Sequence, residues 1–191
     1  RELGVDEQLE RWEKMLDKKG FKEGEAVLRF KSSIDDKNPA MRDFPLARIN
    51  LTKHPKQGTK YRVWPLMNLA VSVDDIELGM THVIRGKDHR DNAKRQEMIF
   101  KVFNKKPPWT FFIGRIKFTD LVLSKRKIEE LIKKGKYSGW DDPRLPTLAS
   151  LRKRKFKPAV FAVFAEQRGL TEVDKVMSEK DSFKVLDDLD K

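Results

Sequence analysis

The chain has 191 residues, of which 42 are Lys or Arg and 30 are Asp or Glu, so its formal net charge at pH 7 is +12. This length suits one ordinary domain or two small ones, and the absence of cysteine excludes disulfides and Cys-ligated metal sites. No apolar run is long enough to cross a membrane and no signal-peptide pattern opens the chain, so we expect a soluble, cytoplasmic protein without a membrane partner.

The charge indicates either a polyanionic partner such as nucleic acid or a heavily charged, solvated surface. Cations and acids are mixed along the chain, which favours a folded domain over a basic tail. Only three histidines are present, and they are scattered. The sequence therefore predicts no metal site in the protein.

The first third of the chain predicts one helix, one strand and two loops. Apolar residues recur at helical spacing over residues 5–16, and this helix is expected to end near Gly20. Residues 26–30 alternate as a strand does, whereas the proline-bearing stretches 32–45 and 54–59 are typical of loops.

The middle of the chain has the pattern of a parallel α/β sheet, in which strands alternate with a helix. Residues 63–73 are mostly apolar and are predicted to form a buried strand region. A short strand is expected to run into Gly86, and a helix follows it. The predicted elements after residue 80 are strands 81–84, 111–113 and 116–118, and a helix over 92–103.

The last third is predicted to be helical. One apolar stripe contains Ile128 and is closed by Gly135, and a second contains Leu148 and Leu151. A third helix is expected to open at Pro158 and stop at Gly169, and another to start near Asp181.

The segment Leu123-Ser124-Lys125-Arg126-Lys127 places cations at the start of a predicted helix. A helix N-terminus binds anions, because its backbone N–H groups point outward and its dipole adds to the side-chain charge. A lysine there can follow the charge that builds on departing pyrophosphate. The alternative is a solvated basic helix start without a ligand.

The segment Thr81-His82-Val83-Ile84-Arg85-Gly86-Lys87-Asp88-His89 places an arginine at the end of a predicted strand, where α/β folds bind ligands. The planar fork of Arg85 suits a carboxylate. The alternative is a structural ion pair with Asp88 or Asp91. Further on, residues 139–147 hold a tryptophan, two acids and two prolines, which predicts a rigid loop that faces a partner.

These three segments, in this order and spacing, resemble class I glutamyl- and glutaminyl-tRNA synthetases of the archaeal and eukaryotic type. The match runs from about Gly20 to Gly169 and includes Asn38-Pro39-Ala40-Met41-Arg42-Asp43, Arg48-Ile49 and Trp64-Pro65-Leu66. It implies an α/β fold in which residues 63–122 form the second half of a Rossmann-type catalytic domain. Residues 1–62 would then be part of an α+β insertion that binds the tRNA acceptor end. Residues 123–191 would be the K-M-S-K-S-type loop and a helical stem-contact region.

The resemblance also implies roles for individual residues. Lys125 would be catalytic and would stabilise the ATP phosphates as pyrophosphate leaves. Arg85, with Met67 as a pocket residue, would bind the amino acid, and the arginine is typical of the glutamyl branch. Leu123, Ser124 and Arg126 would bind ATP together with Lys125. The implied tRNA-binding residues are Asp91, Arg42, Trp140 and Arg144.

The implied reaction is the ATP-dependent activation of glutamate, with Mg²⁺ accompanying ATP, and transfer of the glutamyl group to tRNA. The partner is the glutamate tRNA, with the glutamine tRNA as a second candidate; the sequence leaves the oligomeric state open. The family's other ATP motif, H-x-G-H, is absent and the chain opens on Arg1. We therefore expect an internal fragment that has no aminoacylation activity by itself.

The family pattern is broken at three positions, which are Met67 in place of an aromatic residue, Leu69 in place of phenylalanine and Ile76 in place of histidine. Met67 either loosens selection of the amino acid or fills the core, which is the commoner role of methionine. The alternatives for function are a glutaminyl-tRNA synthetase, against which Arg85 argues, and a tRNA-binding relative without catalysis.

Overall fold

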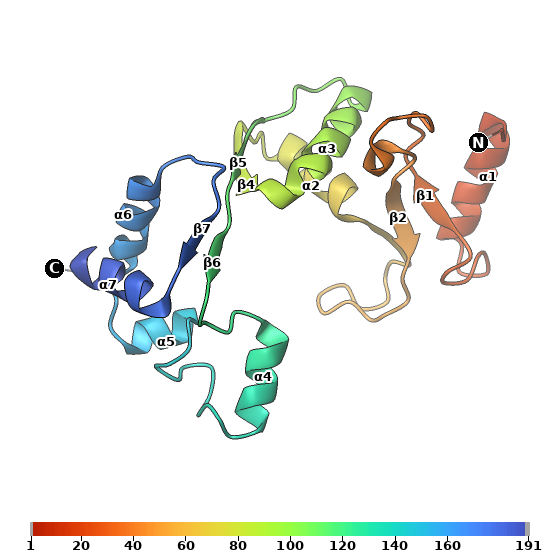
Figure 1. Cartoon of the computed structure of the whole chain (residues 1–191). Coiled ribbons are helices and arrows are strands. Elements are labelled where there is room, and N and C mark those ends of the chain that lie inside the picture. Colours follow the sequence, from red (N-terminus) through yellow and green to blue (C-terminus); the bar gives the residue numbers. More distant parts are fainter. Residues whose placement is uncertain (1, 190–191) are drawn as a thin grey trace. The chain divides into compact units, whose positions relative to one another are not determined.

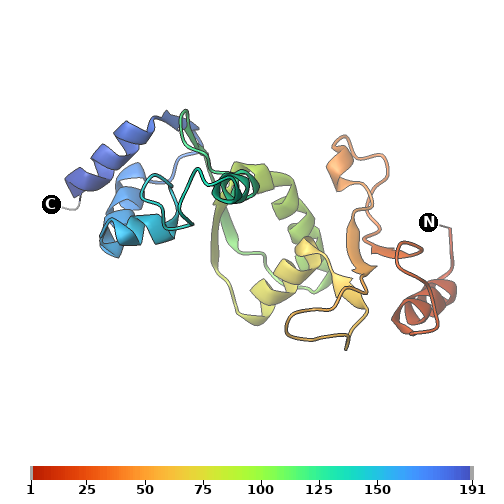
Figure 2. The same cartoon turned by 90° about the horizontal axis from the view of Figure 1, so that it is seen from below.

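The computed structural model describes residues 2–189, which form a mixed α/β fold of two compact units (Figures 1 and 2). The first unit ends at Phe111 and the second begins at Phe112. Each unit contains its own short strands, helices and buried apolar residues.

The first unit begins with a helix, continues with a three-stranded sheet and ends with helices and strands that alternate. The helix predicted over residues 5–16 and the strand predicted within residues 26–30 are both confirmed. The elements are α1 (Val5–Leu16), β1 (Val27–Arg29), η1 (Pro39–Met41), β2 (Pro45–Ile49), β3 (Val63–Pro65), α2 (Met67–Glu77), β4 (His82–Gly86), η2 (Lys87–His89), α3 (Arg90–Val102) and β5 (Trp109–Ile113), the last of which runs across the boundary of the units.

The three-stranded sheet is antiparallel, with β2 between β1 and β3. Val27 of β1 lies opposite Arg48, and Trp64 of β3 lies opposite the same residue on the other side. Ala47 and Ile49, which alternate with Arg48, are buried at 3% and 2% exposure. Because successive side chains of a strand point to opposite faces, one face of β2 is in the core and the other is exposed.

The prediction of a buried strand over residues 63–73 is wrong beyond Pro65, where β3 ends and α2 begins at Met67. A continuous apolar run does not distinguish a strand from a buried helix. In the structure Asn68 and Ser72 are both buried and lie one helical turn apart, and α2 packs against α3. The buried face of this segment therefore has helical spacing.

The remaining predicted elements of the first unit are present. β4 contains the strand expected at 81–84, α3 covers most of the helix expected at 92–103, and β5 contains 111–113. β4 and β5 are neighbours in a two-stranded sheet. One face of α3 is buried and carries Ala93, Gln96, Ile99 and Phe100.

Over its described residues, 112–189, the second unit combines a two-stranded parallel sheet with four helices. β6 pairs with β7, and Ile116 lies opposite Lys175. The sequence predicted β6 and the helices, and it missed β7. The elements are β6 (Ile116–Phe118), α4 (Lys125–Lys133), α5 (Leu148–Lys153), α6 (Pro158–Arg168), β7 (Lys175–Met177) and α7 (Glu179–Leu189).

The helices of the second unit begin and end at residues whose chemistry fixes them. The hydroxyl of Ser124 caps α4, and the hydroxyl of Thr147 caps α5 by accepting from the N–H of Ser150 at 3.1 Å. Pro158 is the first residue of α6, and Gly169 ends it with a φ of 65°, a conformation that glycine adopts without strain. The predicted bounds of this helix are confirmed.

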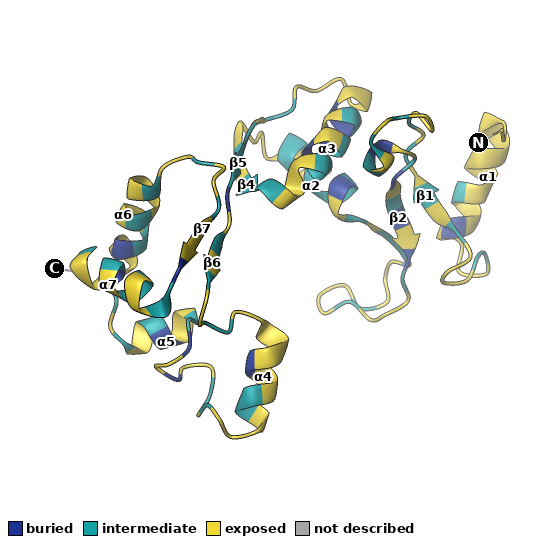
Figure 3. Cartoon of the chain, in the orientation of Figure 1, coloured by how far each residue is buried: buried dark blue, intermediate teal, exposed yellow. Residues whose placement is uncertain are grey.

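The buried positions are spread over the inner faces of the elements, as the dark blue ribbon segments in Figure 3 show. Within the described part of the chain, no helix has the length and apolar character needed to cross a bilayer. Among the described residues of the first unit, Phe44 is the largest fully buried side chain, and its ring stacks on Phe30 with centroids 5.0 Å apart. The buried apolar residues of the second unit are Ile128, Leu145, Val160, Met177 and Leu186.

Candidate functional site

Arg85 lies near the end of β4 and is held by a chain of hydrogen bonds. Its Nη1 donates to Oε1 of Gln96 at 2.8 Å, and Nε2 of Gln96 reaches Oδ1 of Asn68 at 3.4 Å. Gln96 and Asn68 are 5% and 8% exposed. Because the two amides are buried on α3 and α2, they fix the direction of the guanidinium.

A carboxyl group also lies within electrostatic reach of Arg85. Partial burial raises the pKa of Asp75, and the positive charge of Arg85 opposes this rise. The ion pair with Asp88 or Asp91 that the sequence suggested is not the contact seen here: the hydrogen bond of Arg85 goes to Gln96, and Asp91 accepts from Asn38. Arg85 is therefore oriented by a hydrogen bond to a neutral amide, and Asp75 is the carboxyl group that feels its charge.

Met67 is the first residue of α2 and is 45% exposed. The interpretation that it fills the core is therefore wrong for this structure. The next residue, Asn68, is the last member of the hydrogen-bonded chain that starts at Arg85. Met67 is therefore connected to Arg85 only indirectly, through its neighbour Asn68 and the side chain of Gln96.

The predicted phosphate-binding segment lies at the start of α4. Ser124 is the N-cap, and its hydroxyl accepts from the N–H of Lys127 at 3.5 Å. Lys125 and Arg126 occupy the first turn and are exposed, and Leu123, just before the cap, is 53% exposed. The prediction that this segment opens a helix is confirmed, and the cations stand at its positive end, where an anion is favoured.

Asp91 and Arg42, two of the predicted tRNA-binding residues, are on neighbouring parts of the first unit. Asp91 is in the first turn of α3, and its Oδ1 accepts from Nδ2 of Asn38 at 2.8 Å. Nε of Arg42 donates to the carbonyl of Asp36 at 2.7 Å, and the arginine side chain is exposed. The loop that carries Arg42 is thus tied to the helix that carries Asp91.

The loop over residues 139–147 is organised around the buried carboxylate of Asp142, which is 2% exposed. It accepts from Nε and Nη2 of Arg144 at 2.9 and 2.7 Å and from the N–H of Ser138 at 2.9 Å. These bonds hold the pKa of Asp142 well below its usual range. The guanidinium of Arg144 also lies over the ring of Tyr137, 5.1 Å from its centroid. The loop therefore has the internal contacts that a rigid loop needs, and its rigidity and its facing of a partner stay predictions.

Trp140 and Arg144 therefore differ in what they offer a partner. The side chain of Trp140 is 40% exposed, and its carbonyl accepts from the hydroxyl of Thr147. Arg144 binds Asp142 and also donates to the carbonyl of Lys136 at 2.8 Å. Much of its hydrogen-bonding capacity is used inside the loop, so the structure gives it a structural task that the sequence did not indicate.

Sequence reasoning missed two amides that position the candidate residues. Gln96 is a polar residue on the apolar face of α3, and this break in the pattern was a signal of a buried polar contact. Asn38 precedes Pro39, and its side chain caps η1, as asparagine often does before a proline turn. The long-range partners of both amides lie outside their own elements, which no local pattern reveals.

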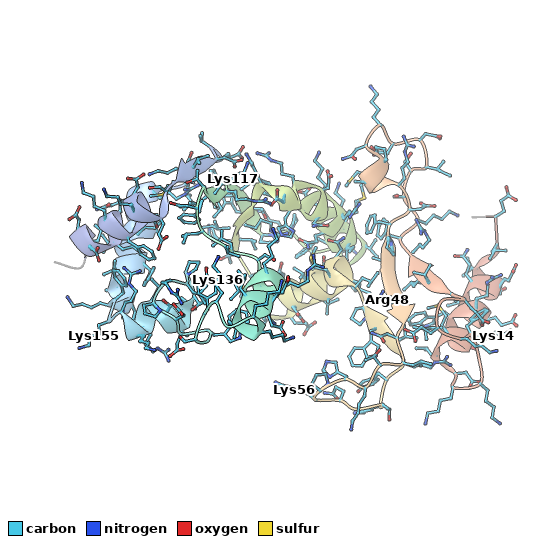
Figure 4. The ribbon with its side chains drawn as sticks, turned by 60° about the horizontal axis from the view of Figure 1, so that its bottom comes forward. Lys14, Arg48, Lys56, Lys117, Lys136 and Lys155 are labelled. Atoms are coloured by element: carbon cyan, nitrogen blue, oxygen red, sulfur yellow. The ribbon has the colours of Figure 1, made fainter. Side chains whose placement is uncertain are left out.

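Cationic side chains occur on loops and helices throughout the chain, among them the labelled Lys56 and Lys155 in Figure 4. Among residues 2–189, no three His, Asp or Glu side chains come together in a way that would hold a metal ion.

The sequence of this chain matches one family over residues 1–190, that of the catalytic domain of class I tRNA synthetases. The family is the E and Q type, and the chain belongs to it. Among curated proteins, the chain is 45% identical over 179 residues to the glutamate–tRNA ligase of Thermococcus kodakarensis and 46% identical over 179 residues to that of Pyrococcus horikoshii. Both alignments cover 93% of this chain and 31% of the relative.

A third relative is the glutamate–tRNA ligase of Methanocaldococcus jannaschii, which is 47% identical over 174 residues, 91% of this chain and 31% of that protein. The chain therefore spans about a third of the length of the curated relatives that it matches. The residues that the family matches include the Arg85, Lys125 and Asp142 segments.

Proposed function

We propose that the protein to which this chain belongs is a glutamate–tRNA ligase. In the first step the carboxylate of glutamate attacks the α-phosphorus of ATP, and pyrophosphate leaves. In the second step a terminal ribose hydroxyl of tRNA attacks the glutamyl-adenylate and AMP leaves. The observation that carries the proposal is the identity of 45–47% to curated glutamate–tRNA ligases over more than nine-tenths of this chain. A cytoplasmic location follows from this role.

Arg85 is proposed to bind a carboxylate of glutamate. Its guanidinium offers two parallel N–H donors, which match the two oxygens of a carboxylate. The hydrogen bond from Nη1 to Gln96 uses one donor and fixes the plane of the group. An arginine oriented in advance loses less freedom when the substrate binds, so its contact contributes more to affinity.

Lys125 is proposed to stabilise the phosphates of ATP, with Leu123, Ser124 and Arg126 forming the rest of the loop. The lysine is exposed in the first turn of α4, where the helix dipole adds to its charge. Its ammonium favours the transition state because negative charge increases on the pyrophosphate as the bond to the α-phosphorus breaks. Magnesium is proposed only as the ion that accompanies ATP, since the described residues gather no ligand set of their own.

The three predicted regions are proposed to divide these tasks. Residues 1–62 would belong to an insertion that binds the tRNA acceptor end, and residues 63–122 to the second half of a Rossmann-type catalytic domain. Residues 123–191 would form the phosphate loop and a stem-contact region. The tRNA contacts proposed within them are Asp91, Arg42, Trp140 and Arg144.

A glutaminyl-tRNA synthetase is the second candidate, because the matched family contains both types. Arg85 is the residue that separates the two. A cation matches the charged side chain of glutamate, whereas the neutral amide of glutamine gives it no charge to pair with. The third candidate, a tRNA-binding relative without catalysis, has no physical need for Arg85 and Lys125 together.

The test is aminoacylation by the full-length protein with glutamate or glutamine and with each of the two tRNAs. The proposal predicts charging with glutamate and a loss of at least about tenfold in kcat/KM for glutamate in Arg85→Ala and Arg85→Lys, because lysine does not copy the fork. Arg11→Ala, which removes an exposed arginine paired with Glu7 at 3.6 Å, is the matched control. Preferential charging with glutamine, or no charging at all, would refute the proposal.

A further inference from the structure

The loop between β1 and β2 is closed at its base by paired hydrogen bonds. The N–H of Ser32 donates to Oδ1 of Asp43 at 2.8 Å, and the N–H of Asp43 donates to Oγ of Ser32 at 2.8 Å. Oγ of Ser32 in turn donates to the carbonyl of Met41 at 2.5 Å. Asp43 has a φ of 35°, in the left-handed region that costs most residues free energy. The base of this loop therefore has one defined conformation.

The tip of the same loop is fastened to α3, which lies far along the sequence. Oδ1 of Asn38 accepts from the N–H of Ala40, and Nδ2 of Asn38 donates to Oδ1 of Asp91 at 2.8 Å. Nε of Arg95 donates to the carbonyl of Ala40 at 2.6 Å, and its guanidinium lies 5.5 Å from the ring centroid of Phe44. The side chain of Asn38 thus bonds both to its own loop and to the helix.

The fastened loop carries exposed charges of both signs, with the acid Asp35 beside the cations. Lys37 and Arg42 are exposed, and Arg42 is aligned by the bond from its Nε to the carbonyl of Asp36 at 2.7 Å. Lys94 is exposed on α3, one helical turn from the residues that hold the loop. Arg42 is held in place by its hydrogen bond to the loop backbone, and an arginine held towards solvent suits one phosphate of an extended nucleic-acid backbone.

We propose that Asn38 is a positioning residue for tRNA. It acts through Asp91 and holds the loop that carries Arg42 against α3, so that the tRNA backbone meets a surface already in its bound form. The inference rests on the proposed function for its ligand. Without the bond from Asn38 the loop must be ordered when tRNA binds, and that cost appears in the affinity for tRNA and not in the chemical step.

The experiment exchanges the two partners in the full-length protein. Asn38→Asp places a carboxylate against Asp91 and breaks the bond by repulsion. The double variant Asn38→Asp with Asp91→Asn restores it with donor and acceptor reversed, and the carboxylate introduced at position 38 still accepts from the N–H of Ala40. Asn50→Asp is the control, because Asn50 caps a different loop of the same unit by accepting from the N–H of Thr52 at 3.0 Å.

Asn38→Asp is expected to raise KM and Kd for tRNA about tenfold, the effect of losing one hydrogen bond to a charged group. At saturating tRNA, kcat and KM for glutamate should stay within about twofold of wild type. The double variant should bind tRNA as tightly as Asp91→Asn alone. The control should change none of these constants. A merely structural role would instead lower the melting temperature and kcat of Asn38→Asp without a specific change in tRNA affinity.

Two results would overturn the inference. One is an unchanged Kd for tRNA in Asn38→Asp, measured by filter binding. The other is a double variant that binds tRNA much more weakly than Asp91→Asn alone, because that single variant removes the charge of Asp91 but keeps an acceptor for Asn38. A wild-type protein that binds tRNA but charges nothing would refute the proposed function. The Kd values of the variants for tRNA would then still decide this inference by themselves.

Discussion

Replacing Gln96 with leucine tests whether the candidate carboxylate site depends on a neutral amide. Leucine keeps the volume of the buried side chain and removes Oε1, which accepts from Nη1 of Arg85 at 2.8 Å. The 3.4 Å contact with Asn68 is also lost. Arg85 keeps its charge, so the change affects the direction of the guanidinium and not its presence.

The expected size follows from the kind of hydrogen bond that is removed. A bond to a charged group contributes about 1.5–3 kcal/mol. Arg85 is only partly buried, so water can replace part of the lost contact and the lower value applies. Since about 1.4 kcal/mol corresponds to a factor of ten, KM for glutamate should rise about tenfold while kcat changes little.

The assay is steady-state aminoacylation by the full-length protein with glutamate varied at saturating ATP and tRNA. Gln167→Leu is the matched control, because Gln167 is an exposed glutamine on α6. Thermal unfolding of both variants separates a local change from a loss of the fold. If KM for glutamate stays at its wild-type value in a folded Gln96→Leu variant, the orientation of Arg85 by this amide is irrelevant to substrate binding.

Four further predictions concern chemistry and stability. Lys125→Ala should lower kcat about 100-fold with KM for ATP changed only a few-fold, because its contact strengthens in the transition state; equal losses in both would indicate plain binding. The depressed pKa of Asp142 stabilises the fold above about pH 4, and this contribution is lost as the pH falls through the native pKa. Asp142→Asn should therefore melt at a lower temperature than wild type at neutral pH, and the difference between the two melting temperatures should shrink in acid. Asp75 has the opposite sign, because its raised pKa makes its ionisation cost stability as the pH rises from about 4 through the native pKa. Asp75→Asn should therefore be more stable than wild type at pH 7, and a gain of the same size in the control Glu77→Gln, an exposed acid on α2, would contradict this. Lys155 has a φ of 66°, and Lys155→Gly should raise the free energy of unfolding in urea by about 0.5 kcal/mol, whereas any loss would show that the backbone there is unstrained.

Local sequence signals predicted the helices well because the residues that end them act locally. Ser124, Pro158 and Gly169 each fix a helix end through their own backbone or side chain. β7 was missed because a three-residue strand carries almost no pattern of its own, and its partner β6 lies far along the sequence. The helix α2 was mistaken for a strand because an apolar run is compatible with either.

The sequence drew attention to those members of the candidate site that stand in motifs. Arg85 and Lys125 stand in motifs, so the sequence alone drew attention to them. Gln96 and Asn38 do not stand in such motifs. Each is singled out only by a hydrogen bond to a residue in another element. Such partners are defined by tertiary packing, which brings the side chains together only after the elements have formed.

The parallel pairing of β6 with β7 has a consequence for how the second unit forms on the ribosome. β6 is synthesised first, and its partner appears only after α4, α5 and α6 have been made. Until then the backbone N–H and C=O groups of β6 lack the strand that they pair with in the folded unit, and closing so long a loop is slow. The helices can form early from local contacts, so the sheet is expected to be the last part of this unit to assemble during translation.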